Sequence, residues 1–302
     1  MDHPSHLRPK LAGIWLPLVT PFRDGELDET SLKRLATHLA QTPLDGFILA
    51  ATTGEALTLD DAETARLVDV VAGATGASRP IYLGLSGSDT RRMIRRLAAT
   101  ADWPIAGYLI ACPYYSRPSQ DGLYRHFAAL AGSTARPIIL YNIPYRTGVS
   151  LANETLFRLA ELPNIVGLKD CCADMMQGFD LLRGRPSGLS VLTGEDALFY
   201  NAIAQGADGG ILASAHVDPA AFGAVRDLLI AGNRTEALAR WSRLVDVVRL
   251  LFAEPSPAPI KHWLWRASVI ASPELRLPMT GISSGLGERL DRMRAGGALA
   301  AA

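Results

Sequence analysis

Several residue types are scarce in this 302-residue chain, and each scarcity excludes a class of protein. It holds three cysteines, at positions 112, 171 and 172, without CxxC spacing, and an odd count without a secretory signal argues against a disulfide framework. Its six histidines include no HxH or HExxH pair that would place two ligands for zinc on one face. We therefore expect no metal and no cofactor.

Excess charge of either sign and long apolar runs are also missing. Basic and acidic residues number 30 each, so there is no net charge that would attract nucleic acid or an anionic membrane. No apolar run reaches the roughly 18 residues of a membrane span, and the first ten residues lack the apolar stretch of a signal peptide. These absences predict a cytoplasmic protein with small-molecule partners, and no nucleic-acid or membrane partner.

Lysine is the scarce basic residue: 26 of the 30 basic residues are arginine. Where a generic surface cation suffices, this chain usually has arginine, so a lysine inside an apolar segment indicates that a primary amine is needed there. Lys169, which ends the apolar run 165–168, meets that description. Lys10 lies in a polar lead-in, Lys33 in an early helix, and Lys261 just after a proline-rich stretch.

Eight short apolar runs, each bounded by glycine or proline, alternate with stretches of helical spacing. Apolar strands that alternate with helices predict parallel strands covered by helices, and eight units predict a closed (β/α)8 TIM barrel. The alternative is an open doubly wound sheet, which is less favoured because no strand leads into a GxGxxG turn. The predicted strands are 13–19, 46–51, 80–85, 105–111, 137–142, 165–169, 190–193 and 209–213.

Beyond the eighth strand the pattern is wholly helical, with a proline-rich break at 254–259. This region is longer than the one helix needed to finish a barrel. We expect residues 1–218 to form the barrel core through strand eight. Residues 219–302 would add the closing helix and a C-terminal helical appendage, ending in a frayed Ala/Gly-rich tail.

The active site of such a barrel forms where the strands end, and Lys169 and Tyr141 end neighbouring strands. Partial burial lowers the pKa of a lysine, so that more neutral amine is available to form a Schiff base with a ketone. A phenol within reach can relay the protons that this reaction moves. From the residues alone, a structural lysine paired with Asp170 or Glu195 remains an equal alternative.

Two further groups at this end of the barrel suit a carboxylate ligand. The hydroxyls of Thr52 and Thr53 precede a turn at Gly54 that exposes backbone N–H groups. Arg146, in the loop after strand five, can hold a carboxylate through two hydrogen bonds. Among 26 arginines, however, a solvated loop residue is the simpler interpretation of Arg146, and Thr-Thr-Gly is also ordinary turn sequence.

Six motifs in one order resemble the dihydrodipicolinate synthase and N-acetylneuraminate lyase family of class I pyruvate-dependent aldolases. The resemblance covers essentially the entire chain, and the 28 positions from Tyr141 to Lys169 agree with the family pattern. The motifs are PLVTPF at 17–22, TTGE at 52–55, PYYSRPSQDGLYRHF at 113–127, YNIPYRTG at 141–148, IVGLKD at 165–170 and RLPM at 276–279.

The resemblance implies roles for individual residues. Lys169 would form the Schiff base with pyruvate, and Tyr141 would carry protons to and from the intermediate. Thr52 would link Tyr141 to Tyr115, which the family donates across a tight dimer interface, and Thr53 would bind the pyruvate carboxylate. A homo-oligomer, either a dimer or a tetramer of two dimers, is therefore expected.

The resemblance also implies how the substrates are held. Main-chain groups at Gly194 and Ile211 would lie near pyruvate. Arg146, within a Pro-X-Arg-Thr-Gly segment, would hold the carboxylate of aspartate semialdehyde, as in dihydrodipicolinate synthases and unlike most sialic-acid lyases. The expected reaction is that of 4-hydroxy-tetrahydrodipicolinate synthase, a lyase of lysine and diaminopimelate biosynthesis.

Some positions depart from the family pattern. Tyr145 replaces a small residue before the arginine, which keeps open a related aldolase or dehydratase acting on sugar acids or other 2-keto acids. Ala51 replaces a glycine, and a keto-acid sensor without turnover is a third alternative. Lysine should inhibit weakly or not at all, because the positions that would bind it differ from the pattern. Those positions hold Ala56, Asp61, Thr64, Ser88 and Arg92.

Overall fold

A computed structural model describes residues 9–296 and contains a closed barrel of eight parallel strands, which confirms the predicted (β/α)8 fold. Around the barrel the strand order is β1-β10-β9-β8-β7-β6-β5-β4. The strands are β1 (Gly13–Pro17), β4 (Gly46–Leu49), β5 (Ile81–Leu85), β6 (Gly107–Ala111), β7 (Ile138–Asn142), β8 (Ile165–Asp170), β9 (Ser190–Thr193) and β10 (Gly209–Ile211). Of the predicted Ala/Gly-rich tail at 295–302, residues 297–302 lie outside the described residues.

Side chains on each strand alternate between the barrel interior and the layer beneath the helices. In β7, Ile139 and Tyr141 belong to an apolar cluster that takes side chains from every barrel strand. Ile138 and Leu140 belong to the larger cluster that packs the strands against the helices. Both faces of a barrel strand are thus buried, which explains why the strands read as continuous apolar runs.

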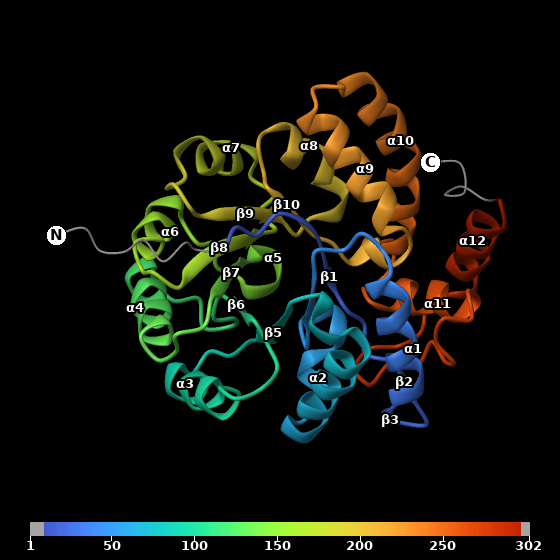
Figure 1. Cartoon of the computed structure of the whole chain (residues 1–302), viewed down its shortest axis with the longest axis horizontal. Coiled ribbons are helices and arrows are strands. Elements are labelled where there is room, and N and C mark those ends of the chain that lie inside the picture. The colour runs from blue at the N-terminus through green and yellow to red at the C-terminus, as the bar shows by residue number, and fades with distance from the viewer. Residues whose placement is uncertain (1–8, 297–302) are drawn as a thin grey trace.

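Helices surround the barrel (Figure 1). Side chains of Asp, Ser or Asn precede most of them, and α2 begins with a capping box in which Asp60 and Glu63 each accept from the other's backbone N–H. The helices that follow the strands are α1 (Glu29–Ala40), α2 (Asp61–Thr75), α3 (Thr90–Ala99), α4 (Gln120–Ala131), α5 (Pro144–Thr147), α6 (Asn153–Leu159), α7 (Met175–Gly184), α8 (Phe199–Ala204) and α9 (Pro219–Ile230). Short 3-10 turns include η1 (Thr52–Gly54) and η5 (Ala213–His216).

Three more helices follow: α10 (Arg234–Leu251), α11 (Ala258–Arg266) and α12 (Ser284–Ala295). The proline-rich break separates α10 from α11, as expected. The expectation of an entirely helical region is wrong for residues 267–283, which contain no helix. Pro273 and Pro278 each lack the N–H that a helix interior needs, and the segment is instead held by contacts to the barrel. We call residues 267–283 the C-terminal strap.

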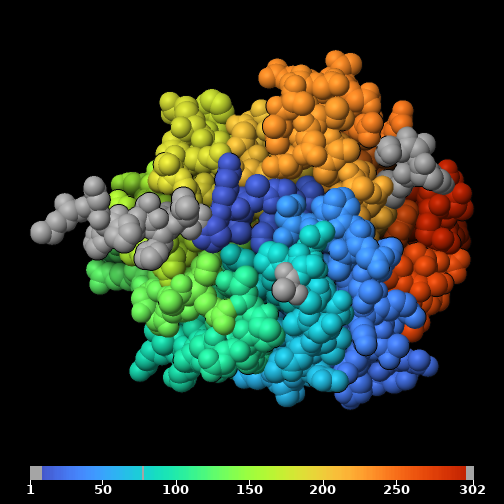
Figure 2. Space-filling view, in the orientation of Figure 1, coloured from blue at the N-terminus to red at the C-terminus, as the bar shows by residue number. Residues whose placement is uncertain are grey.

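The strap and α11 lie beside elements from the beginning of the chain. Arg34 Nε on α1 donates to Val269 O at 2.7 Å, and Ala271 N donates to Ser31 Oγ at 3.0 Å. Blue and red segments accordingly meet on one side of the molecule in Figures 1 and 2. No helix within residues 9–296 is long and apolar enough to cross a membrane.

Candidate active site

Lys169 and Tyr141 lie opposite each other on neighbouring strands inside the barrel. The register pairs Tyr141 on β7 with Lys169 on β8, and Lys169 Nζ lies 4.4 Å from the centre of the Tyr141 ring. Lys169 is only 5% exposed and Tyr141 only 6%. An amine and a phenol therefore share one apolar environment.

A register shift between β7 and β8 creates this pairing. Ile138 pairs with Ile165, but Ile139 pairs with Gly167, so Val166 is an extra residue in β8. Without the shift, Tyr141 would pair with Leu168 instead of Lys169. Because successive side chains of a strand point to opposite faces, Lys169 would then point away from the interior face that holds Tyr141. The irregularity thus brings Lys169 into the interior beside the phenol.

Burial sets the protonation of both groups. Burial lowers the pKa of Lys169, and the positive charge of Arg146 lowers it further. Three nearby groups act in the opposite direction and raise it: Cys171, Asp196 and Glu195. Burial raises the pKa of Tyr141 well above its ordinary value, so the phenol carries its proton at neutral pH. The site therefore offers an amine that loses its proton more easily than a solvated lysine, beside an intact proton donor.

Asp170 does not occupy the position that a structural pairing with Lys169 would require. Its Oδ1 accepts from Asn142 Nδ2 at 3.0 Å and from Cys172 N at 3.2 Å. Burial raises the pKa of Asp170 to about 6, which Asn142 partly offsets. Asp170, the neighbour of Lys169 in sequence, thus stabilises the turn after β8 instead of pairing with the lysine.

Gly194 lies directly against the lysine. A Cβ at this position would lie 2.3 Å from Lys169 Cε and 2.6 Å from Cys171 Sγ, closer than atoms can approach. Gly194 N donates to Asp170 O at 2.7 Å. Ile211, at the end of β10, is fully buried in the interior cluster that also contains Tyr141. Both residues therefore border the same interior as the lysine.

Two buried groups near Lys169 were not predicted from the sequence. Asp196 Oδ1 accepts from Ser214 N at 2.6 Å, and burial raises the pKa of Asp196. Cys171 Sγ lies 3.9 Å from the Tyr141 hydroxyl, and burial raises the pKa of this thiol to about 12. Both follow barrel strands within three residues, so the strand-end rule that selected Lys169 could have identified them.

A cavity of about 340 Å³ opens beside Tyr141 and contains some, but not all, of the predicted residues. Thr52, Tyr141 and Arg146 line it, together with Pro278 and Met279 of the strap. The predicted residues that do not line it are Lys169, Thr53, Tyr115, Gly194 and Ile211. The cavity thus connects the phenol to the threonine turn and the arginine, while the lysine lies buried behind the phenol.

The Thr52–Thr53 turn is held in place by backbone contacts. Thr53 is buried and Thr52 is exposed. Gly54 N donates to Ala51 O at 3.0 Å, and Gly54 O accepts from Thr20 Oγ1 at 2.7 Å. A Cβ on Gly54 would lie 2.9 Å from Leu18 O. Glycine is needed for this close approach, which fixes the turn against β1.

Arg146 lies on the short helix α5, not in a loop as its sequence context suggested. Pro144 begins this helix because its fixed φ suits a first helical position, and Gly148 ends it at φ 77. The guanidinium lies 5.6 Å from the centre of the exposed Tyr145 ring. The arginine therefore stands at the cavity with an aromatic ring beside it.

Tyr115 is not brought to Tyr141 within one chain. Its side chain is 95% exposed, and its backbone adopts φ 70. Its N donates to Thr147 O at 3.3 Å, so the backbone lies next to α5 while the ring points into solvent. A single chain leaves this phenol apart from the other predicted site residues.

Lys261 corrects one expectation from the sequence. Lys169 was predicted to be the lysine of an apolar environment, but Lys261 on α11 is also fully buried. It forms an ion pair with Glu55, which follows the threonine turn. Its surroundings come from segments distant in sequence, so the neighbouring residues gave no sign of its burial.

Comparisons with known proteins agree over nearly the whole chain. A sequence model of the dihydrodipicolinate synthetase family matches residues 10–293. The 4-hydroxy-tetrahydrodipicolinate synthase 2 of Clostridium acetobutylicum is 43% identical over 94% of this chain and 99% of its own length. The 4-hydroxy-tetrahydrodipicolinate synthase of Syntrophus aciditrophicus is 36% identical over 93% of this chain and 96% of its own.

Solved structures give the same result. The 4-hydroxy-tetrahydrodipicolinate synthase of Methylacidiphilum fumariolicum SolV superposes with a TM-score of 0.91 at 33% identity, over 96% of this chain and 98% of that one. The dihydrodipicolinate synthase of Aquifex aeolicus also gives 0.91, at 30% identity over 95% and 98%. One similar structure is described as a monomeric dihydrodipicolinate synthase variant.

Proposed function

The chain belongs to the dihydrodipicolinate synthetase family, and from that premise we propose that it condenses pyruvate with aspartate semialdehyde, the 4-hydroxy-tetrahydrodipicolinate synthase reaction. Relatives that carry this name are 43% and 36% identical over more than nine tenths of the chain. The observation that carries the proposal is the buried pairing of Lys169 with Tyr141, where burial lowers the pKa of the amine.

In this proposal Lys169 is the nucleophile. Its neutral amine attacks the ketone carbon of pyruvate, and loss of water gives an imine. The imine withdraws electrons, so the adjacent methyl group releases a proton and becomes a nucleophilic enamine carbon. That carbon forms the new C–C bond with the aldehyde of the semialdehyde. Cyclisation then releases the lysine amine.

Tyr141 is proposed to move the protons. Imine formation needs a proton on the departing hydroxyl, and the protonated phenol beside the amine can supply it. Thr52 would link Tyr141 to a Tyr115 phenol, and Thr52 shares the cavity with Tyr141. The high exposure of Tyr115 supports its donation to a partner chain, in a dimer or a tetramer of two dimers.

The remaining predicted residues would hold the substrates. Thr53 and main-chain groups at Gly194 and Ile211 would contact the pyruvate carboxylate and keto group. Arg146, on the cavity wall, would hold the carboxylate of the semialdehyde through two hydrogen bonds.

Borohydride trapping tests the nucleophile. With pyruvate and borohydride, the intact protein should gain the mass of one reduced pyruvate adduct per chain, and Lys169→Ala should gain none. The paired variant Glu55→Gln with Lys261→Met serves as a second buried-lysine comparison, because it leaves no buried charge unpaired, and it should still be labelled at saturating pyruvate. Absence of labelling in the wild type, or equal labelling of Lys169→Ala, would show that this lysine is not the nucleophile.

A substrate panel tests the second half of the reaction. Arg146→Ala should raise KM for the semialdehyde at least about tenfold while pyruvate trapping persists, since one bidentate contact is lost. Arg158→Ala is the matched control, because Arg158 also stacks on a tyrosine, at 4.1 Å from the Tyr124 ring, but on α6.

The second candidate keeps the pyruvate chemistry and changes the aldehyde. The bulky Tyr145 beside Arg146 favours it, because this ring alters the approach to the arginine. Turnover of sugar-derived 2-keto acids, without product from the semialdehyde at millimolar concentration, would favour this aldolase or dehydratase.

A further inference from the structure

Lys261 and Glu55 form a buried ion pair that the proposed mechanism does not use. Lys261 is 0% exposed and Glu55 is 5% exposed, and Lys261 Nζ also donates to Glu274 O at 2.7 Å. Moving two such charges out of water is costly, and apolar residues of similar volume often stabilise a fold as well or better. Stability alone therefore gives little reason for this pair.

The carboxylate of Glu55 joins three parts of the chain. Its Oε1 contacts Lys261 on α11, and its Oε2 accepts from the backbone N of Arg276 in the strap at 3.1 Å. Its own backbone belongs to the segment after β4, where Glu55 N donates to Thr52 O at 3.1 Å. One side chain thus fixes the threonine turn relative to α11 and the strap.

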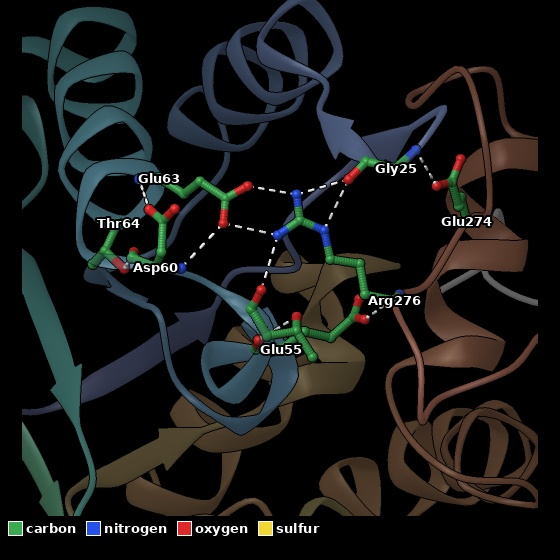
Figure 3. Close-up of polar contacts among 8 residues, drawn as sticks. Gly25, Glu55, Asp60, Glu63, Thr64, Glu274 and Arg276 are labelled. Carbon is green, nitrogen blue, oxygen red and sulfur yellow. Dashed lines mark hydrogen bonds and ion pairs between the residues drawn. The ribbon is translucent and has the colours of Figure 1, made fainter.

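Arg276 extends this connection outward (Figure 3). Its guanidinium forms an ion pair with Glu63 on α2 and donates to Thr58 O at 2.8 Å and to Gly25 O at 2.8 Å. Glu274 accepts from Gly25 N at 2.7 Å, in the turn of the hairpin formed by β2 (Phe22–Arg23) and β3 (Glu26–Leu27). The strap is therefore attached on both sides of the Glu55 contact.

The same two segments form walls of the cavity. Thr52 and Glu55 line it from the turn, and Pro278 and Met279 line it from the strap. Glu55 has φ 54, a left-handed conformation that is unfavourable for a non-glycine residue and persists only where the surroundings fix it. The ion pair supplies that constraint directly behind Thr52 and Thr53.

We propose that Glu55 is a positioning residue that holds the Thr52–Thr53 turn in the geometry that binds the carboxylate of pyruvate, with Lys261 and Arg276 as its fixed partners. This inference rests on the proposed function. Glu55 touches no reacting atom and acts through the threonines. Its loss should weaken pyruvate binding much more than it slows the chemistry at Lys169.

The test is the pyruvate concentration that gives half-maximal borohydride labelling of Lys169. The paired variant Glu55→Gln with Lys261→Met removes both buried charges together, which avoids leaving one unpaired. We expect it to need about tenfold more pyruvate than the wild type, because a small displacement of a binding group costs affinity steeply. Labelling at saturating pyruvate, and the thermal midpoint without ligand, should stay close to the wild-type values.

Two further variants make the result decisive. Arg276→Gln keeps the Glu55–Lys261 pair but releases the guanidinium contacts of the strap, and should need about threefold more pyruvate. Glu29→Gln is the control, because Glu29 also pairs with an arginine, Arg66, between two helices away from the cavity. It should match the wild type.

Wild-type pyruvate dependence in both the paired variant and Arg276→Gln would overturn the inference. If the paired variant does not fold, Arg276→Gln decides alone, because its side chain is partly exposed. A wild-type protein that takes no label from pyruvate contradicts the proposed function instead, so the two failures are distinguishable.

Discussion

The two buried lysines have different neighbouring side chains, which supports the proposal that Lys169 is the reactive amine and Lys261 a structural one. Lys169 faces a phenol ring and Lys261 faces a carboxylate, although Lys261 also lies 4.4 Å from the centre of the Phe22 ring. Burial lowers the pKa of both, and that of Lys261 to about 8 despite the opposing effect of Glu55. The Glu55 carboxylate keeps Lys261 charged near neutral pH. The Asp170 carboxylate does not do the same for Lys169, because it accepts hydrogen bonds from Asn142 and Cys172 instead.

At the residue scale, Gly194→Ala should abolish most activity without unfolding the protein. The added methyl group would occupy space within 2.3 Å of Lys169 Cε, so the lysine must leave its position beside Tyr141. We expect kcat to fall by about a hundredfold or more, which is typical for a displaced reacting group. Steady-state kinetics and borohydride labelling measure the effect.

Gly223→Ala on α9 is the matched control. Apart from the neighbouring residues and backbone of its own helix, no heavy atom would lie within 4 Å of the added Cβ, and alanine favours a helix interior over glycine by about 0.5–1 kcal/mol. Its activity should be unchanged and its thermal midpoint slightly higher. Normal activity in Gly194→Ala would mean that the lysine tolerates a different position.

Some of these residues could be predicted from the sequence and others could not. Tyr141 and Lys169 lie one residue before the ends of β7 and β8, and strand ends are recognisable from apolar runs bounded by glycine and proline. The Lys261–Glu55 pair joins residues 206 positions apart, so no local pattern reveals it. The register shift at Val166 is equally hidden, because it depends on how two strands pair.

At the scale of elements, His216 connects β1 to η5, the turn that follows β10. Its Nε2 accepts from Val19 N at 3.1 Å, and its Nδ1 lies 2.8 Å from Ala213 O. This pattern requires a neutral ring with the proton on Nδ1, since protonation of Nε2 would remove the acceptor. Burial lowers the pKa of His216 to about 4.

This shift predicts a loss of stability in acid. Between the folded pKa of about 4 and the ordinary histidine pKa of 6.5, the unfolded chain binds the proton and the folded chain does not. The contribution of His216 is therefore complete above pH 6.5 and is lost as pH falls toward 4, on the order of 3 kcal/mol. Thermal midpoints of the wild type and His216→Gln, measured from about pH 7 to about pH 4.5, test it.

The wild type should lose more stability over this range than His216→Gln. The comparison is needed because Asp170 acts in the opposite direction: burial raises its pKa to about 6, so its unfavourable ionisation develops as pH rises. Asp170 is present in both proteins and cancels in the difference. Parallel pH profiles would exclude His216 as the titrating group.

Elements differ in how well the sequence predicted them. Each barrel strand was placed within a few residues, because strands buried on both faces are continuous apolar runs. The strap was mistaken for helix because its conformation comes from contacts with the β2–β3 hairpin, α1 and α2. In the sequence of the strap, only Pro273 and Pro278 indicated that this segment is not helical.

At the scale of the whole molecule, the exposed Tyr115 predicts complementation between inactive variants. If each chain donates this phenol to its partner, a mixed dimer of Lys169→Ala and Tyr115→Phe has one site with both groups intact. Co-refolding the two inactive proteins should therefore restore up to about a quarter of the wild-type activity, for random pairing of chains.

Tyr124→Phe in place of Tyr115→Phe is the control mixture. Tyr124 on α4 stacks on Arg158 within its own chain, so this variant should be active before mixing. If mixing Lys169→Ala with Tyr115→Phe restores nothing although mixed dimers are detected by mass, each site is complete within one chain.

The ion pair between Glu55 and Lys261 joins an early part of the chain to a late one, so its second member is synthesised long after its first. A growing chain releases β1 through β10 before α11. On the ribosome, a barrel with Lys169 and Tyr141 in place would still lack the partners of Glu55. If Glu55 holds the threonine turn as proposed, the site for the pyruvate carboxylate would be complete only when the last helices emerge.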